Sequence, residues 1–219
     1  YAGVIQVSSS VNWIYVRSSG LGSHVMGPWY SNAAHTQEFP SYPANTGVLY
    51  RIPRTPTFPT TKTLTGMGAI GYFVDGVAAF DNRDAFSYVT ASATDASPVN
   101  GLRGDGVWNR EAYANEGVTF DPAFAHQAQT NHHYHANAPA VRYALGDHVD
   151  FNSTTKLYTE STAAVTAHSP IVAWLADGLP VYGPYGYASP MDAKSGLRRM
   201  TSGYVKRDGT NGTTNLAAT

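Results

Sequence analysis

The stretch IGYFVDGVAAF at residues 70–80 places two short apolar runs on either side of the pair Asp75-Gly76. Runs rich in β-branched and aromatic residues favour strands, and Asp-Gly between two such runs is a strong hairpin signal. The reason is that a type I′ turn needs positive φ at both central positions. A matching pattern, VAWLADGLPVY, returns without gaps at residues 172–182, an offset of 102 (172 minus 70). The sequence therefore predicts two related Asp-Gly hairpins.

Other segments extend this β pattern. Residues 11–16 and 47–52 are short runs of β-branched and aromatic residues bounded by Ser, Gly or Pro, and both predict strands. The best helical candidate covers residues 121–128, where an Asp-Pro pair suits the N-cap and the first helical position. We expect a mainly β protein with few short helices. No linker separates the two hairpins, so we expect a single domain over residues 1–219.

The composition is typical of a β-rich exported protein. Only 13% of the residues are charged, and the chain has 15 Tyr, 21 Gly and 13 Pro, whereas a helical cytosolic protein carries more Glu, Lys and Leu. The net charge of −1 argues against a nucleic-acid partner, because phosphate binding needs clustered Lys and Arg. No stretch approaches the roughly 18 apolar residues of a membrane span. We therefore predict an extracytoplasmic location: secreted, periplasmic or at the cell surface.

A cluster of histidines is the strongest sign of chemistry in the chain. Residues 131–135 read NHHYH, so three of the 8 His fall within four consecutive positions. On a strand, His133 and His135 share one face with Cβ atoms roughly 7 Å apart, and His132 and Tyr134 share the other. Such a His-x-His pair can converge on one metal ion. The chain has no Cys, which excludes thiolate ligands, and imidazole with oxygen ligands suits copper, zinc, nickel or non-haem iron.

Two ligands alone make a weak metal site, so further ligands must come from elsewhere in the chain. Asp177 also suits a turn without a metal, Tyr182 also suits core packing, and the clustered His also suit a structural role through backbone hydrogen bonds. We predict one transition metal ion, copper ahead of zinc, with calcium at the acidic run of residues 81–84 as a weaker alternative. The predicted metal ligands are His133, His135, His168, Asp177 and Tyr182, with His126 and His148 as further candidates.

Longer segments around these residues resemble the YHYH-domain family of bacterial exported proteins. The resemblance covers most of the chain from about residue 24 onward. It implies an exported protein in which the His-Tyr motif matters, and it implies no particular reaction. It rests on NHHYHA at residues 131–136, HSPIV at 168–172 and DGLPVYGP at 177–184, with shorter segments at 25–29, 80–84 and 115–121.

The family is named for the motif Tyr-His-Tyr-His, and this chain has His132 at the first position of that motif. By strand alternation, the change lies on the face away from His133 and His135, so the chelating pair is kept. Family members continue past the point where this chain ends at Thr219, and the chain begins with Tyr1 rather than Met. We therefore expect a chain that is processed or trimmed at its ends.

Several kinds of function stay open at this stage. The first is an exported metal-binding protein, in which a coordination position open to solvent would add redox or hydrolytic chemistry. The second is a structural or interaction module, such as a cell-surface or filament subunit that forms homo-oligomers, with the His-Tyr cluster in a structural role. Carbohydrate binding through exposed Trp and Tyr is a third. Whether the protein is an enzyme stays open.

Overall fold

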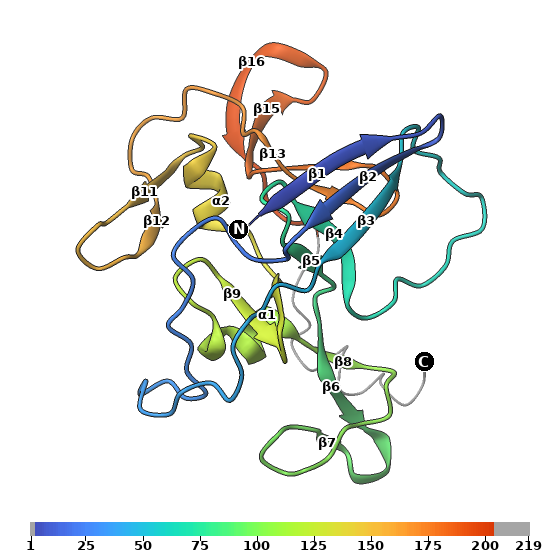
Figure 1. The fold of residues 1–219 in the computed structure, drawn as a ribbon, viewed down its shortest axis with the longest axis vertical. Coiled ribbons are helices and arrows are strands. Elements are labelled where there is room, and N and C mark those ends of the chain that lie inside the picture. The colour runs from blue at the N-terminus through green and yellow to red at the C-terminus, as the bar shows by residue number, and fades with distance from the viewer. Residues whose placement is uncertain (1–2, 204–219) are drawn as a thin grey trace. The chain divides into compact units, whose positions relative to one another are not determined.

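The fold is mainly β, as the sequence predicts (Figure 1). The computed structural model describes residues 3–203, and within that range no helix is long and apolar enough to cross a membrane. Contacts divide this part of the chain into two compact units, one of residues 3–81 and 117–199 and the other of residues 82–116 and 200–203. The single domain stays a prediction.

The first unit is a set of small β-sheets with two short helices. Its elements are β1 (Val4–Ser9), β2 (Trp13–Ser18), β3 (Val48–Pro53), β4 (Ala69–Phe73), β5 (Ala78–Phe80), the 3₁₀ helix η2 (Gly117–Thr119), β9 (Ala125–Ala128), β10 (Asn131–Tyr134), α2 (Pro139–Ala144), β11 (Val149–Phe151), β12 (Tyr158–Glu160), β13 (Ile171–Leu175), β14 (Pro180–Tyr182), β15 (Tyr185–Ser189) and β16 (Asp192–Arg199).

A six-stranded sheet with the order β14-β13-β4-β5-β10-β9 is the centre of this unit. A separate sheet holds β1, β2 and β3, which lie side by side (blue to cyan in Figure 1). The pairs β11-β12 and β15-β16 form two further antiparallel ribbons. The strands expected near the N-terminus are present as β2 and β3.

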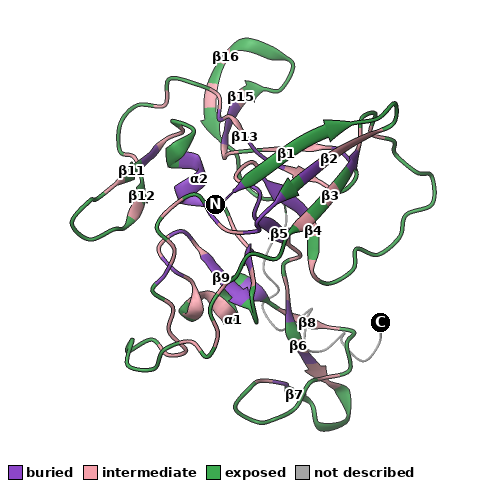
Figure 2. Cartoon of the chain, viewed as in Figure 1, coloured by how far each residue is buried: buried purple, intermediate pink, exposed green. Residues whose placement is uncertain are grey.

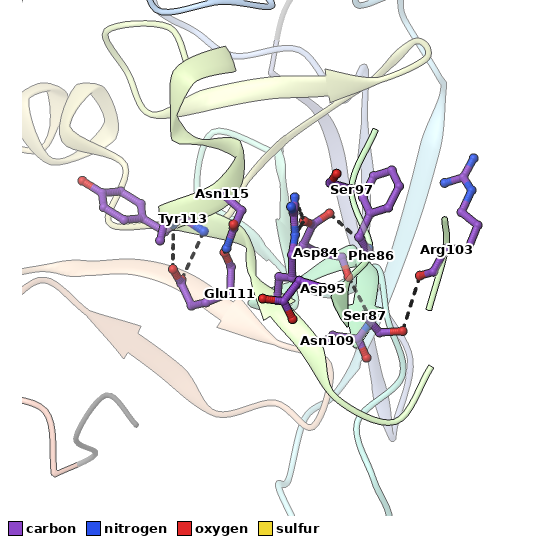
Figure 3. Close-up of polar contacts among 12 residues, drawn as sticks. Asp84, Phe86, Ser87, Asp95, Ser97, Arg103, Asn109, Glu111, Tyr113 and Asn115 are labelled. Atoms are coloured by element: carbon purple, nitrogen blue, oxygen red, sulfur yellow. Dashed lines mark hydrogen bonds and ion pairs between the residues drawn. The ribbon is translucent and has the colours of Figure 1, made fainter. Parts of the chain in front are cut away.

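The second unit is a small antiparallel sheet. On β6, Ser87 Oγ donates a hydrogen bond to Arg103 O (3.4 Å), and Asn109 Nδ2 of β8 donates to Asp84 O (2.9 Å), so the strands and their connecting loop are tied together (Figure 3). The elements of this unit are β6 (Arg83–Val89), the 3₁₀ helix η1 (Thr90–Ser92), β7 (Thr94–Asp95), β8 (Asn109–Glu111) and α1 (Ala112–Glu116).

Both Asp-Gly segments form turns between antiparallel strands, β4-β5 and β13-β14. The turns are not of type I′, because in each pair the glycine alone has positive φ (85° at Gly76 and 87° at Gly178). In the first turn Gly76 N donates to Phe73 O (2.8 Å) and Phe73 N donates to Val77 O (2.8 Å). This is a three-residue hairpin loop that ends in a left-handed glycine. Asp75 suits it because its Oδ1 accepts from Val77 N (3.2 Å).

The two hairpins are related by a local two-fold axis. β4 pairs antiparallel with β13, and Tyr72 lies opposite Trp174. These two positions are equivalent in the repeat, because they are 102 residues apart (174 minus 72). The repeat in the sequence is therefore a structural symmetry. Backbone hydrogen bonds on either side of the axis recur with the same offset, from Val74 N to Val172 O (2.9 Å) and from Ala176 N to Ile70 O (2.8 Å).

The strand β10 lies beside the first hairpin. It pairs parallel with β5 and antiparallel with β9. Three of its four residues are buried, whereas β1 is exposed along its length (green in Figure 2). The ring of Tyr134 packs against Phe73 at 4.7 Å between centroids, in a core that also contains Ala79, Ala125 and Val141 of α2. Pairing with β5 and β9 and core packing around Tyr134 therefore fix the position of β10.

The helix predicted over residues 121–128 is wrong. Its second half is β9, which pairs with β10 along its whole length. Its first half is a tight turn, in which Asp121 Oδ1 accepts hydrogen bonds from Ala123 N (2.9 Å) and Ala125 N (3.2 Å). An Asp that suits a helix N-cap suits such a turn equally well, and the pairing with β10 decides between the two.

Candidate metal centre

Strands β9 and β10 bring three histidines together. In their antiparallel pairing, His133 of β10 lies directly opposite His126 of β9. His135 follows the end of β10 and shares the face of His133 by strand alternation. One ligand nitrogen from each ring lies within 4.8 Å of the other two. We call His126, His133 and His135 the histidine triad.

Hydrogen bonds through Nδ1 fix the two rings contributed by the His-x-His motif. Nδ1 of His133 lies 2.9 Å from the carbonyl oxygen of Asn131, and Nδ1 of His135 lies 2.9 Å from the carbonyl oxygen of Asp81. A carbonyl oxygen only accepts, so each bond needs the proton on Nδ1. A neutral ring of this tautomer has its lone pair on Nε2. Both rings therefore present Nε2 as the ligand atom.

The spacing of these ligand atoms fits one metal ion. Nε2 of His133 and Nε2 of His135 lie 3.1 Å apart, which is hydrogen-bond distance. When both rings are neutral with the proton on Nδ1, two lone pairs face each other across this distance. A cation between them would stabilise that arrangement. Two nitrogens on a tetrahedral zinc ion, each at about 2.0–2.1 Å, are roughly 3.3 Å apart. The ring of His126 is anchored by a contact of 2.7 Å between its Nδ1 and Thr119 Oγ1, a hydroxyl that can donate or accept.

Aromatic rings enclose the triad. Phe80 stacks on His133 with 3.8 Å between ring centroids, and Phe120 packs edge-on against His126 at 4.9 Å. His126 and His133 are buried, whereas His135 is half-buried. The triad therefore has apolar surroundings, and His135 is its most accessible member.

A second polar group lies on the other face of β10, as strand alternation predicts for His132 and Tyr134. Both side chains are buried. Tyr134 OH donates to Asp75 Oδ2 (3.1 Å) and lies 3.3 Å from His24 Nδ1. His24 Nε2 in turn lies 3.8 Å from Asp121 Oδ2. We call His24, His132, Tyr134, Asp75 and Asp121 the inner polar cluster.

Burial governs the protonation of the inner polar cluster. Burial lowers the pKa of His132 to about 4, with the Asp121 carboxylate opposing this effect and His24 adding to it. Burial also raises the pKa of Asp75, against hydrogen bonds from Val77 N and Tyr134 that lower it. His132 is therefore a neutral imidazole at pH 7, with one lone pair available.

Comparison with known proteins identifies the family. The sequence model of the YHYH protein family matches residues 49–218. The chain belongs to the YHYH protein family. The match begins later than the resemblance suggested, so the segment at residues 25–29 lies outside it. No curated protein and no solved structure matches the chain.

The structure does not bring the other predicted ligands of this YHYH protein to the triad. Tyr182 lies on β14 and Asp177 in the turn before it, and three strands (β13, β4 and β5) separate β14 from β10. At about 4.8 Å per strand, this places β14 roughly 19 Å from β10. His168 packs against Tyr182 (5.1 Å between centroids) and Tyr187 (4.9 Å). His126, named only as a further candidate, occupies the third place instead.

The signal that could have promoted His126 is local. The strands β9 and β10 have four residues each, at 125–128 and 131–134, and only Gln129 and Thr130 separate them. Such a pattern also fits a hairpin, and Gln129 has the positive φ (57°) of a tight connection. A hairpin would have placed His126 opposite His133. The other candidate, His148, packs against Tyr185 at 4.9 Å.

Asp84, one of the two acids in the run suggested for calcium, has a different role in the second unit. Asp84 is buried on β6, and its Oδ2 accepts a hydrogen bond from Arg110 Nε (2.7 Å). Asp84 Oδ1 accepts from Phe86 N (3.3 Å; Figure 3). A carboxylate that is paired with a guanidinium is a poor calcium ligand, so we carry no calcium site forward.

Proposed function

We propose that this YHYH protein is exported and binds a transition metal ion, copper ahead of zinc, through Nε2 of His126, His133 and His135. The observation that carries the proposal is the 3.1 Å approach of two Nε2 atoms whose rings are both fixed through Nδ1. Outer hydrogen bonds of this kind orient the histidines of metal sites. Export is supported by the low charge and by the resemblance to exported proteins.

The ligand set narrows the metal and the kind of site. Three imidazoles without a thiolate suit copper and zinc, whereas calcium and magnesium take oxygen ligands. Three protein ligands leave a fourth tetrahedral position for water or a small ligand, as in catalytic zinc centres. We place this position at His135, the half-buried member of the triad. We therefore propose a metal centre that takes an external ligand, and we assign no reaction.

Removing two triad ligands should remove one equivalent of metal. Untagged protein loaded with Cu(II) or Zn(II) and then desalted should retain metal at the triad, and the variant His133→Ala/His135→Ala should retain one equivalent less. The physical reason is that a single remaining imidazole cannot hold the ion through desalting. Elemental analysis against protein concentration measures the difference.

A matched double variant serves as the control. His148→Ala/His168→Ala removes two imidazoles that pack elsewhere, on Tyr185 and Tyr182, and it should keep the full metal content. Far-UV circular dichroism checks that both double variants are folded. Wild-type protein that retains no metal after loading, or a control that loses as much as the triad variant, would contradict the proposal.

Assembly into oligomers is the second candidate function, and β1 favours it. This strand is at one edge of its sheet, and it exposes Val4, Ile5 and Val7, the last by 62%. An exposed apolar edge strand can pair with a second chain.

We expect sedimentation to show that the wild type self-associates more as its concentration rises. The substitution Val7→Lys should suppress this association. The control Val99→Lys, at a residue exposed by 95% in the second unit, should associate like the wild type, and a wild type that stays monomeric would exclude this candidate.

A further inference from the structure

Buried polar atoms without a hydrogen-bond partner gather on the face of β10 opposite the triad. Within residues 3–203 they include His24 Nε2, both ring nitrogens of His132 and the side-chain oxygen of Gln127. Gln127 lies directly opposite His132 in the pairing of β9 with β10, and the rings of His24 and His132 are 6.1 Å apart. A buried polar atom that lacks a partner costs free energy. Several such atoms at one place indicate a bound polar species.

The orientation of His24 resembles that of a metal ligand. Its Nδ1 contacts Tyr134 OH (3.3 Å), and that hydroxyl donates its proton to Asp75 Oδ2 (3.1 Å). The hydroxyl therefore accepts from Nδ1, which assigns the ring proton of His24 to Nδ1 and the lone pair to Nε2. A histidine held in this way by a hydroxyl and a carboxylate behind it is the usual outer arrangement of a metal site.

The third donor is a carboxylate that is held firmly in place. Asp121 is buried, and it accepts backbone hydrogen bonds from Gly27 at Oδ2 (2.9 Å) and from Ala123 at Oδ1 (2.9 Å). Its Oδ2 lies 3.8 Å from His24 Nε2, too far for a hydrogen bond. A metal ion bound to both atoms at about 2.0–2.2 Å would span that separation.

We propose that His24, His132 and Asp121 bind a second metal ion, on the face of β10 opposite the triad. Two imidazoles on one tetrahedral ion have ring centroids about 5–5.5 Å apart, so the 6.1 Å between His24 and His132 would shorten by roughly half an ångström on binding. Two nitrogens and one carboxylate oxygen suit zinc and copper. A cavity of about 500 Å³ that is lined in part by Gly27 and Asp121 lies beside the proposed site.

The second site is a feature of this chain rather than of the family motif. His132 stands where the motif has its first Tyr, and His24 lies outside the matched residues 49–218. The substitution His132→Tyr therefore restores the residue of the motif and removes a proposed ligand in one step. It is the natural test variant, because Tyr is the residue that the motif has at this position.

The test is a count of zinc equivalents in the full chain. Protein stripped with a chelator, titrated with Zn(II) and desalted should retain two equivalents in the wild type and one in His132→Tyr. It should also retain one in His24→Gln, a change of similar size that leaves β10 intact. The variant His133→Ala/His135→Ala should keep one as well, and its combination with His132→Tyr should keep none.

The outcomes separate this proposal from that of the triad. If the wild type retains one equivalent of zinc and His132→Tyr retains it too, the second site is overturned. Its polar atoms are then assigned to ordered water. If the wild type retains one equivalent of zinc that the triad variant keeps and His132→Tyr loses, the metal site at the triad is overturned. The second site is then kept. Unfolding of each variant in urea checks that a loss of zinc does not reflect a loss of fold. If His132→Tyr fails this check, the zinc content of His24→Gln decides whether the second site exists.

Discussion

Replacing Arg142 with methionine is expected to lower the free energy of unfolding by about 3–5 kcal/mol at pH 7. Arg142 lies on α2 with its side chain fully buried. Its Nε donates to Asp147 Oδ2 (2.5 Å), and Nη1 and Nη2 both donate to the carboxylate of Glu160. Methionine fills a similar space but leaves the buried Asp147 carboxylate without its cation. An unpaired buried charge is among the largest destabilising effects of a single substitution.

Urea unfolding followed by tryptophan fluorescence measures this effect. The control is Arg17→Met, which changes an exposed arginine of β2 and should alter the free energy of unfolding by less than about 0.5 kcal/mol. A loss in Arg142→Met that is no larger than that of the control would show that the ion pairs contribute little to stability.

The contribution of Arg142 should fall at acid pH. Burial opposes the ionisation of Asp147, but hydrogen bonds from Arg142 and Ser169 outweigh it and hold the pKa of Asp147 below its usual value. Hydrogen bonds from Arg142 and Tyr185 likewise outweigh burial and lower the pKa of Glu160. Carboxyl pKa values that are lower in the folded state add stability above the unfolded value of about 4, and this is lost as the pH falls through the folded value. The difference between wild type and Arg142→Met should therefore shrink from about pH 5 to about pH 2.

Metal loading should produce the second large effect, a gain of about 4 kcal/mol in the free energy of unfolding when free metal exceeds the dissociation constant a thousandfold. The triad joins β9, the end of β10 and, through His135, the carbonyl oxygen of Asp81. These segments separate on unfolding, so the unfolded chain has no preformed site. Urea unfolding with and without Zn(II) measures the gain.

The two double variants show where this gain originates. His133→Ala/His135→Ala should lose the part of the gain that comes from the triad, whereas His148→Ala/His168→Ala should keep all of it. Equal gains in both variants would place the stabilising ion elsewhere in the chain.

Local patterns predicted the strands and the faces of β10, because both depend on residues that are adjacent in the sequence. Alternation along residues 131–135 was enough to place His133 and His135 on one side and His132 and Tyr134 on the other. The helix predicted at residues 121–128 failed because pairing with β10 outweighed a helix-start signal. For the same reason His126 was not among the main predicted ligands, because its place in the triad depends on the register between β9 and β10.

Asp177 was predicted as a ligand, whereas its counterpart in the first hairpin, Asp75, was not considered. The two residues occupy equivalent turns, and nothing local shows which hairpin lies beside β10. The chain places β10 next to β5, by a parallel pairing that no short pattern reveals. Asp75 therefore meets Tyr134, whereas Asp177 is exposed at the other end of the sheet.

The local two-fold axis also has a consequence for the edges of the sheet. The two hairpins pair through β4 and β13 and form four adjacent strands, with β5 and β14 as the outer strands of this group. In this protein β14 ends the sheet, whereas β5 carries the histidine strand. The symmetry of the two hairpins therefore ends at their outer strands, because one of them pairs with β10 and the other has, within residues 3–203, no partner beyond β13 in this sheet.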